Sequence, residues 1–336
     1  MSRRRLTQQQ RARIESIQER RRTKLAERAE QSLSDASDTP SQEGRVVIRH
    51  GATLGVVDES GQVFQCLIRQ NIGHPVCGDR VVWQPVDDHN GVVTALQPRA
   101  SVLSRPDYSG REKPLAANIT QLVVVLAPRP EPSGYLLDQY LIAAETIGVR
   151  PLIAVNKIDL LEDEGKLRFL SAYDLYRRIG YELVEVSAKL AHGLDSLIQH
   201  LAGETSILVG QSGVGKSSLI NALLPNLEIE TGRLSEASGL GRHTTSAATC
   251  YNLQQGGELI DSPGVRSFRL TKLSRGQLEQ GFPEFRPFLG HCRFNNCSHQ
   301  HEPGCAIRQA IETGKVSPQR LDNFLHLAQS TTSGQG

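Results

Sequence analysis

The chain has 336 residues, of which 38% are hydrophobic and 22% charged, and its net charge is +2 at pH 7. It contains no run of about eighteen apolar residues and no apolar segment behind its N-terminal arginines, which argues against a membrane span and a secretory signal. We therefore expect a cytoplasmic protein of two or three domains with reduced cysteines. Cys66, Cys77 and Cys250 lie singly in strand-like stretches and are expected to be small core residues.

Residues 1–44 form an Arg-rich leader that ends in a Ser, Asp, Thr and Pro stretch. Ten Lys or Arg and four Glu lie within residues 1–30, so the positive charge of the chain is concentrated here. Such a segment buries too little apolar surface to fold alone, and disorder is the first expectation. Residues 7–30 lack Gly and Pro, and the alternative is a helix that forms on a polyanion.

Residues 45–108 contain five short β-type runs separated by turn residues. Five strands in about sixty residues predict a small β-barrel of the OB type. Barrels of this type commonly bind RNA through a basic face that carries aromatic side chains. The candidates are Arg49, His50, Phe64, Arg69, Arg80 and Trp83. In so small a barrel, Phe64 and Trp83 are more often core residues than RNA contacts.

Residues 109–270 show an α/β pattern in which strands end in nucleotide-binding motifs. The apolar run 151–155 leads into Asn156, Lys157, Ile158 and Asp159 at its carboxyl end, where ligands bind in open parallel sheets. The Asp159 carboxylate can accept hydrogen bonds from the ring N–H and the exocyclic amine of guanine. Adenine lacks this pair of donors, so the motif favours GTP over ATP. A second strand ends in Ser187, Ala188 and Lys189, a motif that contacts the guanine oxygen in GTPases.

The stretch 210–218 is a phosphate loop between an apolar strand and a helix. It matches G-x-x-x-x-G-K-S with Gly210, Gln211, Ser212, Gly213, Val214, Gly215, Lys216 and Ser217, and Ser218 follows. Its glycines let successive backbone N–H groups point at phosphate, beside the positive end of the following helix. Lys216 supplies a charge for the outer phosphates, and Ser217 is placed to bind magnesium.

Two switch motifs follow the phosphate loop. The first, residues 239–245, contains Thr244 and Thr245; either can bind magnesium, and we assign Thr245. The second follows a strand and contains Asp261, in the position of an outer-shell magnesium ligand, and Gly264, whose N–H can face the terminal phosphate.

The position after the second switch motif is a water-orienting glutamine in many GTPases, but here it is Val265. A valine side chain forms no hydrogen bond, so the isolated protein should hydrolyse GTP slowly. We therefore assign the catalytic roles to His243, Lys216 and Thr245. For His243 the alternative is a contact with RNA or solvent, in which case a group from elsewhere would position the water.

The order of these motifs is permuted. In ordinary small GTPases the phosphate loop precedes both guanine-binding motifs, whereas here Asn156–Asp159 and Ser187–Lys189 precede the loop at 210–218. Joining the old termini and opening the chain elsewhere preserves the sheet, because domain termini commonly lie close together. The sequence therefore predicts a circularly permuted GTPase domain.

Residues 271–336 contain a Cys and His cluster with the spacing C-x4-C-x-H-x5-C. The predicted ligands are Cys292, Cys297, His299 and Cys305. Three thiolates and one imidazole suit a closed, structural zinc site in a C-terminal helical domain. His301 and His291 are rival imidazoles, and His299 is favoured over His301.

Together, the permuted order, the switch sequences, the barrel and the Cys and His cluster resemble the bacterial RsgA (YjeQ) family of ribosome-assembly GTPases over residues 45–330. The resemblance implies a cytoplasmic, monomeric, rRNA-binding GTPase that uses Mg²⁺ with GTP and one Zn²⁺. It implies action late in maturation of the small (30S) ribosomal subunit, with GTP hydrolysis stimulated by that subunit. The alternative is a zinc-dependent RNA-binding scaffold in which GTP is a structural ligand.

Overall fold

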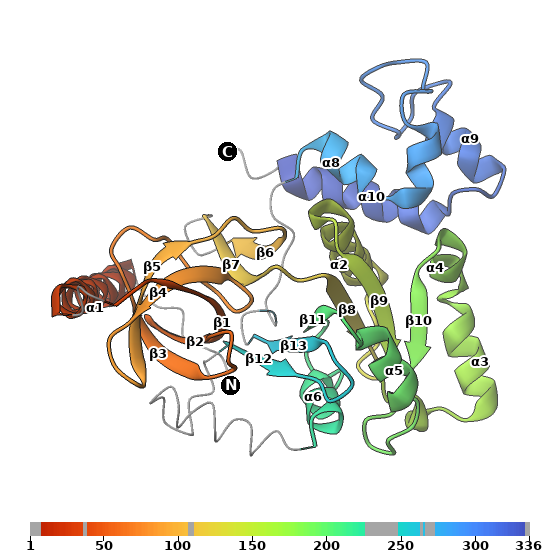
Figure 1. The fold of residues 1–336 in the computed structure, drawn as a ribbon. Coiled ribbons are helices and arrows are strands. Elements are labelled where there is room, and N and C mark those ends of the chain that lie inside the picture. The colour runs from red at the N-terminus through yellow and green to blue at the C-terminus, as the bar shows by residue number, and fades with distance from the viewer. Residues whose placement is uncertain are drawn as a thin grey trace. The chain divides into compact units, whose positions relative to one another are not determined.

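The computed structural model describes residues 8–35, 39–106, 111–225, 248–262, 265 and 273–332 (Figure 1). The chain divides into two compact units. Among the described residues, the first unit contains those up to Ala100 together with Ala248–Tyr251. The second contains those from Ser101 to Pro225 and from Asn252 onward.

The first unit is a closed five-stranded barrel. Its strands are β1 (Gln42–His50), β2 (Thr53–Val57), β3 (Val63–Ile68), β4 (Arg80–Pro85) and β5 (Asn90–Leu96). They follow one another in the order β1-β2-β3-β5-β4, and β4 pairs back onto β1, which closes the sheet. Strand β12 (Ala248–Asn252) adds to β1 through the register Ile48 to Thr249. The predicted N-terminal barrel is confirmed.

The barrel core is built around Trp83. This side chain is fully buried and packs on Phe64, which is 8% exposed, with ring centroids 4.6 Å apart. Gly44 and Gly91 leave room for the indole, since a Cβ added at either would lie within 2.7 Å of a Trp83 atom. Both aromatic rings are therefore core residues of the barrel, the placement that its small size favoured.

The three isolated cysteines lie in this unit and are buried free thiols, as expected. Burial raises the pKa of Cys66 and of Cys77, so both thiols stay protonated near neutral pH.

The leader contains a 28-residue helix, α1 (Gln8–Asp35). Its C-terminal part lies against β3 and β5, where Ala29 is fully buried. Glu30 accepts a hydrogen bond from Nε of Arg69 at 2.8 Å. The structure thus contains the helix that the sequence offered as the alternative to a disordered leader.

The second unit is built on a parallel sheet with the order β10-β9-β8-β11-β13. The strands are β8 (Gln121–Leu126), β9 (Arg150–Val155), β10 (Glu182–Glu185), β11 (Thr205–Val209) and β13 (Glu258–Asp261). Its helices are α2 (Gly134–Ile147), η1 (Ile158–Leu160), α3 (Asp163–Ser171), α4 (Asp174–Ile179), α5 (Leu194–Leu201) and α6 (Lys216–Leu223). A hairpin of β6 (Val102–Pro106) and β7 (Glu112–Ala117) precedes the sheet. Every residue of the central strand β8 is buried, as expected for a parallel sheet covered on both faces.

The C-terminal segment belongs to the same compact unit. It contains α8 (Arg275–Gln280), η3 (Pro283–Phe288), α9 (Ala306–Glu312) and α10 (Pro318–Thr332). Phe282, Phe285 and Phe324 form its core, in one apolar cluster with Ile142 of α2. A Cβ added at Gly281 would lie 2.6 Å from Ile142, so this glycine permits the close approach. The predicted C-terminal helical segment therefore packs directly on a helix of the nucleotide-binding sheet.

Among the described helices, none combines the length and apolar character that a membrane span requires.

Candidate nucleotide and metal sites

The phosphate loop joins the end of β11 to the start of α6. Gly210, Gly213 and Gly215 have φ of +138°, +86° and +93°, a region that glycine adopts without strain. A Cβ at Gly210 would lie 2.4 Å from the carbonyl oxygen of Val125. Lys216 Nζ donates to the carbonyl oxygens of Gly210 and Gln211 at 2.7 and 2.9 Å. The lysine therefore already lies over the loop that would hold phosphate.

Asn156 joins the phosphate loop to both guanine-binding motifs. Its Nδ2 donates to the Val214 carbonyl oxygen at 3.0 Å, and its Oδ1 accepts from the Ala188 N–H at 3.1 Å. The side chain is buried, so its own polar atoms depend on these two partners for hydrogen bonding. The structure thus brings together three motifs that are separated along the chain.

Lys157 lies over the same loop. Its backbone has φ of +63°, and its Nζ donates to the carbonyl oxygens of Gly213 and Arg129 at 2.6 and 3.2 Å. Arg129 lies on the connection between β8 and α2, which carried no sequence signal. This connection is therefore part of the site, although sequence reasoning missed it.

Asp159 is oriented by the other guanine motif. The Ser187 hydroxyl donates to Asp159 Oδ1 at 2.5 Å and accepts from the Leu190 N–H at 3.2 Å. Ser187 is fully buried, whereas Asp159 is partly exposed in η1, which follows β9. The arrangement fixes the direction of a carboxylate that remains accessible to a guanine edge. Sequence reasoning placed Ser187 in the site but did not identify this contact.

The magnesium and switch residues are described only in part. Ser217 is exposed in the first turn of α6, and Asp261 is exposed at the end of β13. Val265 is 2% exposed, so this position presents no polar group to a water molecule. The other predicted switch residues, His243, Thr244, Thr245 and Gly264, lie outside the described residues.

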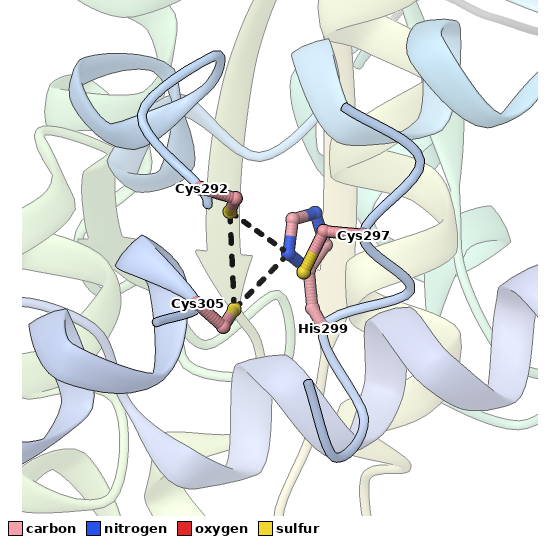
Figure 2. A group of neighbouring side chains, drawn as sticks. All are labelled: Cys292, Cys297, His299 and Cys305. Atoms are coloured by element: carbon pink, nitrogen blue, oxygen red, sulfur yellow. Dashed lines mark hydrogen bonds between the residues drawn. The ribbon is translucent and has the colours of Figure 1, made fainter. Parts of the chain in front are cut away.

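The structure brings the predicted metal ligands Cys292, Cys297, His299 and Cys305 together (Figure 2). Their ligand atoms all lie within 4.8 Å of one another. His299 Nδ1 is 3.3 Å from Cys305 Sγ and 3.7 Å from Cys292 Sγ, and those two sulfurs are 4.0 Å apart. A tetrahedral ion bonded to sulfur at about 2.3 Å separates two sulfur ligands by about 3.8 Å. The cluster therefore fits a four-coordinate metal ion with no position left for water.

The rival imidazoles stand apart from this cluster. His291 and His301 are exposed, whereas His299 is 4% exposed and turns inward on a backbone with φ of +61°. Glu302 holds the turn, because its carboxylate accepts from the N–H groups of Ser298, Gln300 and His301. Hydrogen bonds from the side chain of Ser298, and then from backbone N–H groups that include those of Ser298 and His301, lower the pKa of Glu302 to about 2.

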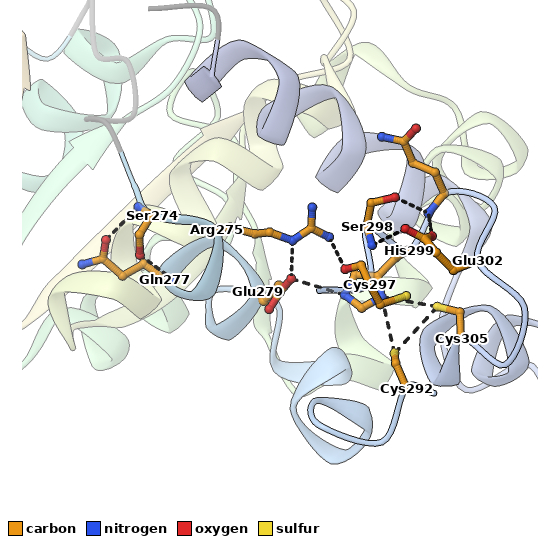
Figure 3. A network of polar contacts seen from close by, with 11 residues as sticks. Ser274, Arg275, Gln277, Glu279, Cys292, Cys297, Ser298, His299, Glu302 and Cys305 are labelled. Atoms are coloured by element: carbon orange, nitrogen blue, oxygen red, sulfur yellow. Dashed lines mark hydrogen bonds and ion pairs between the residues drawn. The ribbon is translucent and has the colours of Figure 1, made fainter. Parts of the chain in front are cut away.

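A carboxylate and a guanidinium support the cluster from α8 (Figure 3). Glu279 Oε1 lies 3.3 Å from Nε2 of His299, on the side of the ring away from the sulfurs. The same oxygen accepts from Arg275 Nε at 2.8 Å, and Arg275 Nη2 donates to the Cys297 carbonyl oxygen at 2.8 Å. A carboxylate behind a histidine ligand fixes the ring and raises its basicity. Glu279 and Arg275 carried no sequence signal, because only the fold brings α8 to the cluster.

Comparison with known proteins identifies the family. A family model described as RsgA GTPase matches residues 96–271. A small ribosomal subunit biogenesis GTPase RsgA from Hahella chejuensis is 46% identical over 337 residues, covering 98% of this chain and 97% of the relative. The chain belongs to the RsgA GTPase family. The RsgA of Pseudomonas aeruginosa strain PAO1 is also 46% identical, over 98% of both chains.

Solved structures agree with membership of the RsgA family. The crystal structure of YjeQ from Thermotoga maritima matches with a TM-score of 0.71 and 29% identity, covering 87% of this chain and 99% of that one. The structure of YloQ, described as a circularly permuted GTPase, matches with a TM-score of 0.69 and 31% identity, covering 88% and 97%. The predicted RsgA resemblance, the permuted GTPase fold and the assignment as a GTP hydrolase are thereby confirmed.

Proposed function

We propose that this chain binds GTP and GDP and hydrolyses GTP during late maturation of the small ribosomal subunit. Asn156 carries the proposal, because its buried side chain ties the phosphate loop to both guanine motifs through two hydrogen bonds. The curated relatives are named for biogenesis of that subunit. The proposed nucleotide-binding residues are Asn156, Lys157, Ile158, Asp159, Ser187, Ala188, Lys189, Gly210, Gln211, Ser212, Gly213, Val214, Gly215, Lys216, Ser217, Ser218, Asp261 and Gly264.

In the proposed complex the Asp159 carboxylate, directed by Ser187, accepts from the guanine edge. Lys157 already bridges two carbonyl oxygens over the loop and can cover the base. Lys216 leaves the carbonyl oxygens it now contacts and binds the outer phosphates, since a phosphate is the stronger acceptor for an ammonium group. Magnesium binds Ser217 and a switch threonine, which we assign as Thr245, and neutralises charge during transfer.

The second switch motif does not supply the group that orients the attacking water. Val265 is buried and apolar, so unaided hydrolysis should be slow. We propose that His243 orients the attacking water when the small subunit is bound, because an imidazole near the switch threonines can accept a proton from that water.

The metal of the C-terminal cluster is proposed to be a single Zn²⁺ with a structural role. Three thiolates and an imidazole are the donor set that zinc prefers, and all four positions of a tetrahedron are filled by the protein. When bound, the ion crosslinks residues 292–305.

We also propose that the chain works as a cytoplasmic monomer and contacts rRNA through its first unit. Arg49 and Arg69 line a cavity of about 240 Å³ between α1 and the barrel, together with His74. Positive side chains at such a cavity favour a phosphate backbone as the partner.

The test is phosphate release from GTP with and without purified small subunits, using the full chain. We expect slow turnover alone and a large stimulation by the subunit. His243→Ala should lose most of the stimulated rate and keep GTP affinity, whereas Lys216→Ala should lose affinity as well. Absence of any stimulation would contradict the proposal and leave GTP as a structural ligand. Full stimulation in the His243 variant would instead assign the water-orienting group to the ribosome.

A further inference from the structure

A cluster of three charged side chains lies buried beneath the C-terminal segment. Arg320 of α10 has its Nη1 2.6 Å from Asp138 Oδ1 and its Nε 2.6 Å from Glu284 Oε1. The side chains of Arg320 and Asp138 are fully buried, and that of Glu284 is 8% exposed. We call Asp138, Glu284 and Arg320 the buried ion cluster.

Neighbouring groups add further contacts to this cluster. Asp138 also accepts from the Tyr176 hydroxyl at 2.8 Å and from Asn323 Nδ2 at 2.7 Å. The guanidinium lies over the Phe282 ring, 4.3 Å from its centroid. Burial alone would lower the pKa of Arg320. The carboxylates of Asp138 and Glu284 instead raise that pKa above its ordinary value, so the Arg320 side chain stays charged. Removing one partner would therefore leave an unpaired charge in the interior.

The buried ion cluster joins two parts of the second unit. Asp138 lies on α2, which follows the central strand of the nucleotide-binding sheet, and Tyr176 lies on α4. Glu284, Arg320 and Asn323 belong to the C-terminal segment. Apolar contacts tolerate sliding, whereas a planar guanidinium held by two carboxylates requires one relative orientation. The cluster therefore sets how the C-terminal segment sits on α2.

The opposite face of α2 contacts the phosphate loop. Tyr140 follows Asp138 by two residues, which turns it about 200° around the helix axis. Its side chain is 2% exposed and makes a hydrogen bond with the backbone of Gly210. Helix α2 is therefore held between the C-terminal segment and the loop that would bind phosphate.

The connection leading into α2 also reaches the nucleotide motifs. The Arg129 carbonyl oxygen accepts from Lys157 Nζ at 3.2 Å. Pro130 lies at Gly213, where an added Cβ would be 3.5 Å from the proline ring. A change in the position of α2 would therefore act on Gly210, Gly213 and Lys157 together.

We propose that Arg320 and Asp138 are positioning residues for nucleotide binding, which hold α2 and its preceding connection against the phosphate loop. The inference rests on the proposed nucleotide site and adds a dependence of that site on the C-terminal segment. It predicts that the position of α10 on α2 affects the affinity for nucleotide, although α10 itself contributes no ligand to the nucleotide site.

The experiment compares full-length Arg320→Met with the wild-type protein. Methionine keeps much of the length of arginine and removes its charge. We expect affinity for a fluorescent GDP analogue to fall about 2- to 30-fold, the range seen for coupling residues without ligand contact. Amide hydrogen exchange should accelerate in residues 127–140, and the zinc content should stay at one ion per chain.

Arg286→Met is the matched control. Arg286 of η3 pairs with Glu145 of α2 at 2.6 Å, so it also links the C-terminal segment to α2, but its side chain is 44% exposed. Solvent weakens such a pair, and we expect a change in affinity of less than about twofold. Asp138→Asn is a milder second variant, because asparagine keeps the size of the side chain and an acceptor for Tyr176. It should lower GDP affinity in the same direction.

The inference is overturned if either cluster variant, folded and with its zinc, binds GDP as tightly as the wild type. It is also overturned if the Arg286 control loses as much affinity as Arg320→Met, since any link between the elements would then suffice. Failure of the wild-type protein to bind GDP would instead refute the proposed function. These outcomes are therefore distinguishable.

Discussion

The role of Glu279 behind His299 gives a graded prediction for metal affinity. Glu279→Gln keeps an oxygen that can accept from Nε2 of His299, but it removes the negative charge. It also weakens the contact with Arg275, which holds the Cys297 carbonyl oxygen. Glu279→Ala removes the contact with His299 altogether. Metal affinity should therefore fall in two steps.

The size of each step follows from the hydrogen bonds that the substitution removes. Loss of an outer-shell partner costs about 10- to 100-fold in metal affinity, or about 1.4 to 2.8 kcal/mol. We assign the lower end to Glu279→Gln, because one of its two hydrogen-bonding functions survives. The upper end belongs to Glu279→Ala, which frees the ring and leaves Arg275 without its carboxylate.

Competition with a chromophoric zinc chelator measures these affinities at fixed pH. Glu312→Gln is the control, because Glu312 is an exposed acid on α9 of the same segment. It changes the net charge by the same amount and should leave the affinity unchanged. Wild-type affinity in Glu279→Ala would refute the reasoning, since the carboxylate would then have no effect on the ligand. Equal losses in all three variants would show that only net charge matters.

Three further predictions concern the nucleotide site and the metal. Asp159→Asn should shift binding from guanine toward xanthine nucleotides, measured by competition with XDP and GDP; unchanged GDP preference would refute the guanine contact. Gly215→Ala should weaken GDP binding at least about tenfold, because the new Cβ would lie 2.4 Å from Asn156 Nδ2 and strain of about 1 to 3 kcal/mol is added. Gly203→Ala, with a similar φ of +75° and no atom within 4 Å, should leave affinity unchanged. Cys297→Ala or chelation of the metal should unfold residues 292–305, which hydrogen exchange would detect. GDP affinity should stay within about twofold, because the aromatic core and the buried ion cluster need no metal. Full loss of GDP binding would contradict this prediction.

The sequence predicted those features whose geometry is local to a short stretch of chain. A phosphate loop needs glycines at fixed positions between a strand and a helix, and residues 210–218 meet that requirement. The predicted metal ligands fall within fourteen residues, so their spacing indicates a metal site, although it left His301 and His291 as rivals to His299. The permuted order was also readable, because it depends only on which motif comes first.

Other features depended on which side of a strand or helix faces the interior. The strand periodicity around Trp83 and Phe64 predicted a barrel, but it did not decide whether the aromatic rings faced RNA or the core. Two glycines on other strands decide this, because they leave the space that the indole fills. The helix α1 likewise gains its place from a contact with the barrel, at Ala29, rather than from its own polar sequence.

The supporting contacts of both sites were decided by the tertiary structure. Arg320 meets Asp138 across 182 positions of sequence, and Glu279 reaches His299 from a separate helix. In the sequence, each of these residues looks like a surface charge on an amphipathic helix. A charged side chain becomes buried only where the fold supplies an opposite charge and hydrogen bonds that offset the loss of water. Because those partners come from distant parts of the chain, local sequence patterns contain no record of them.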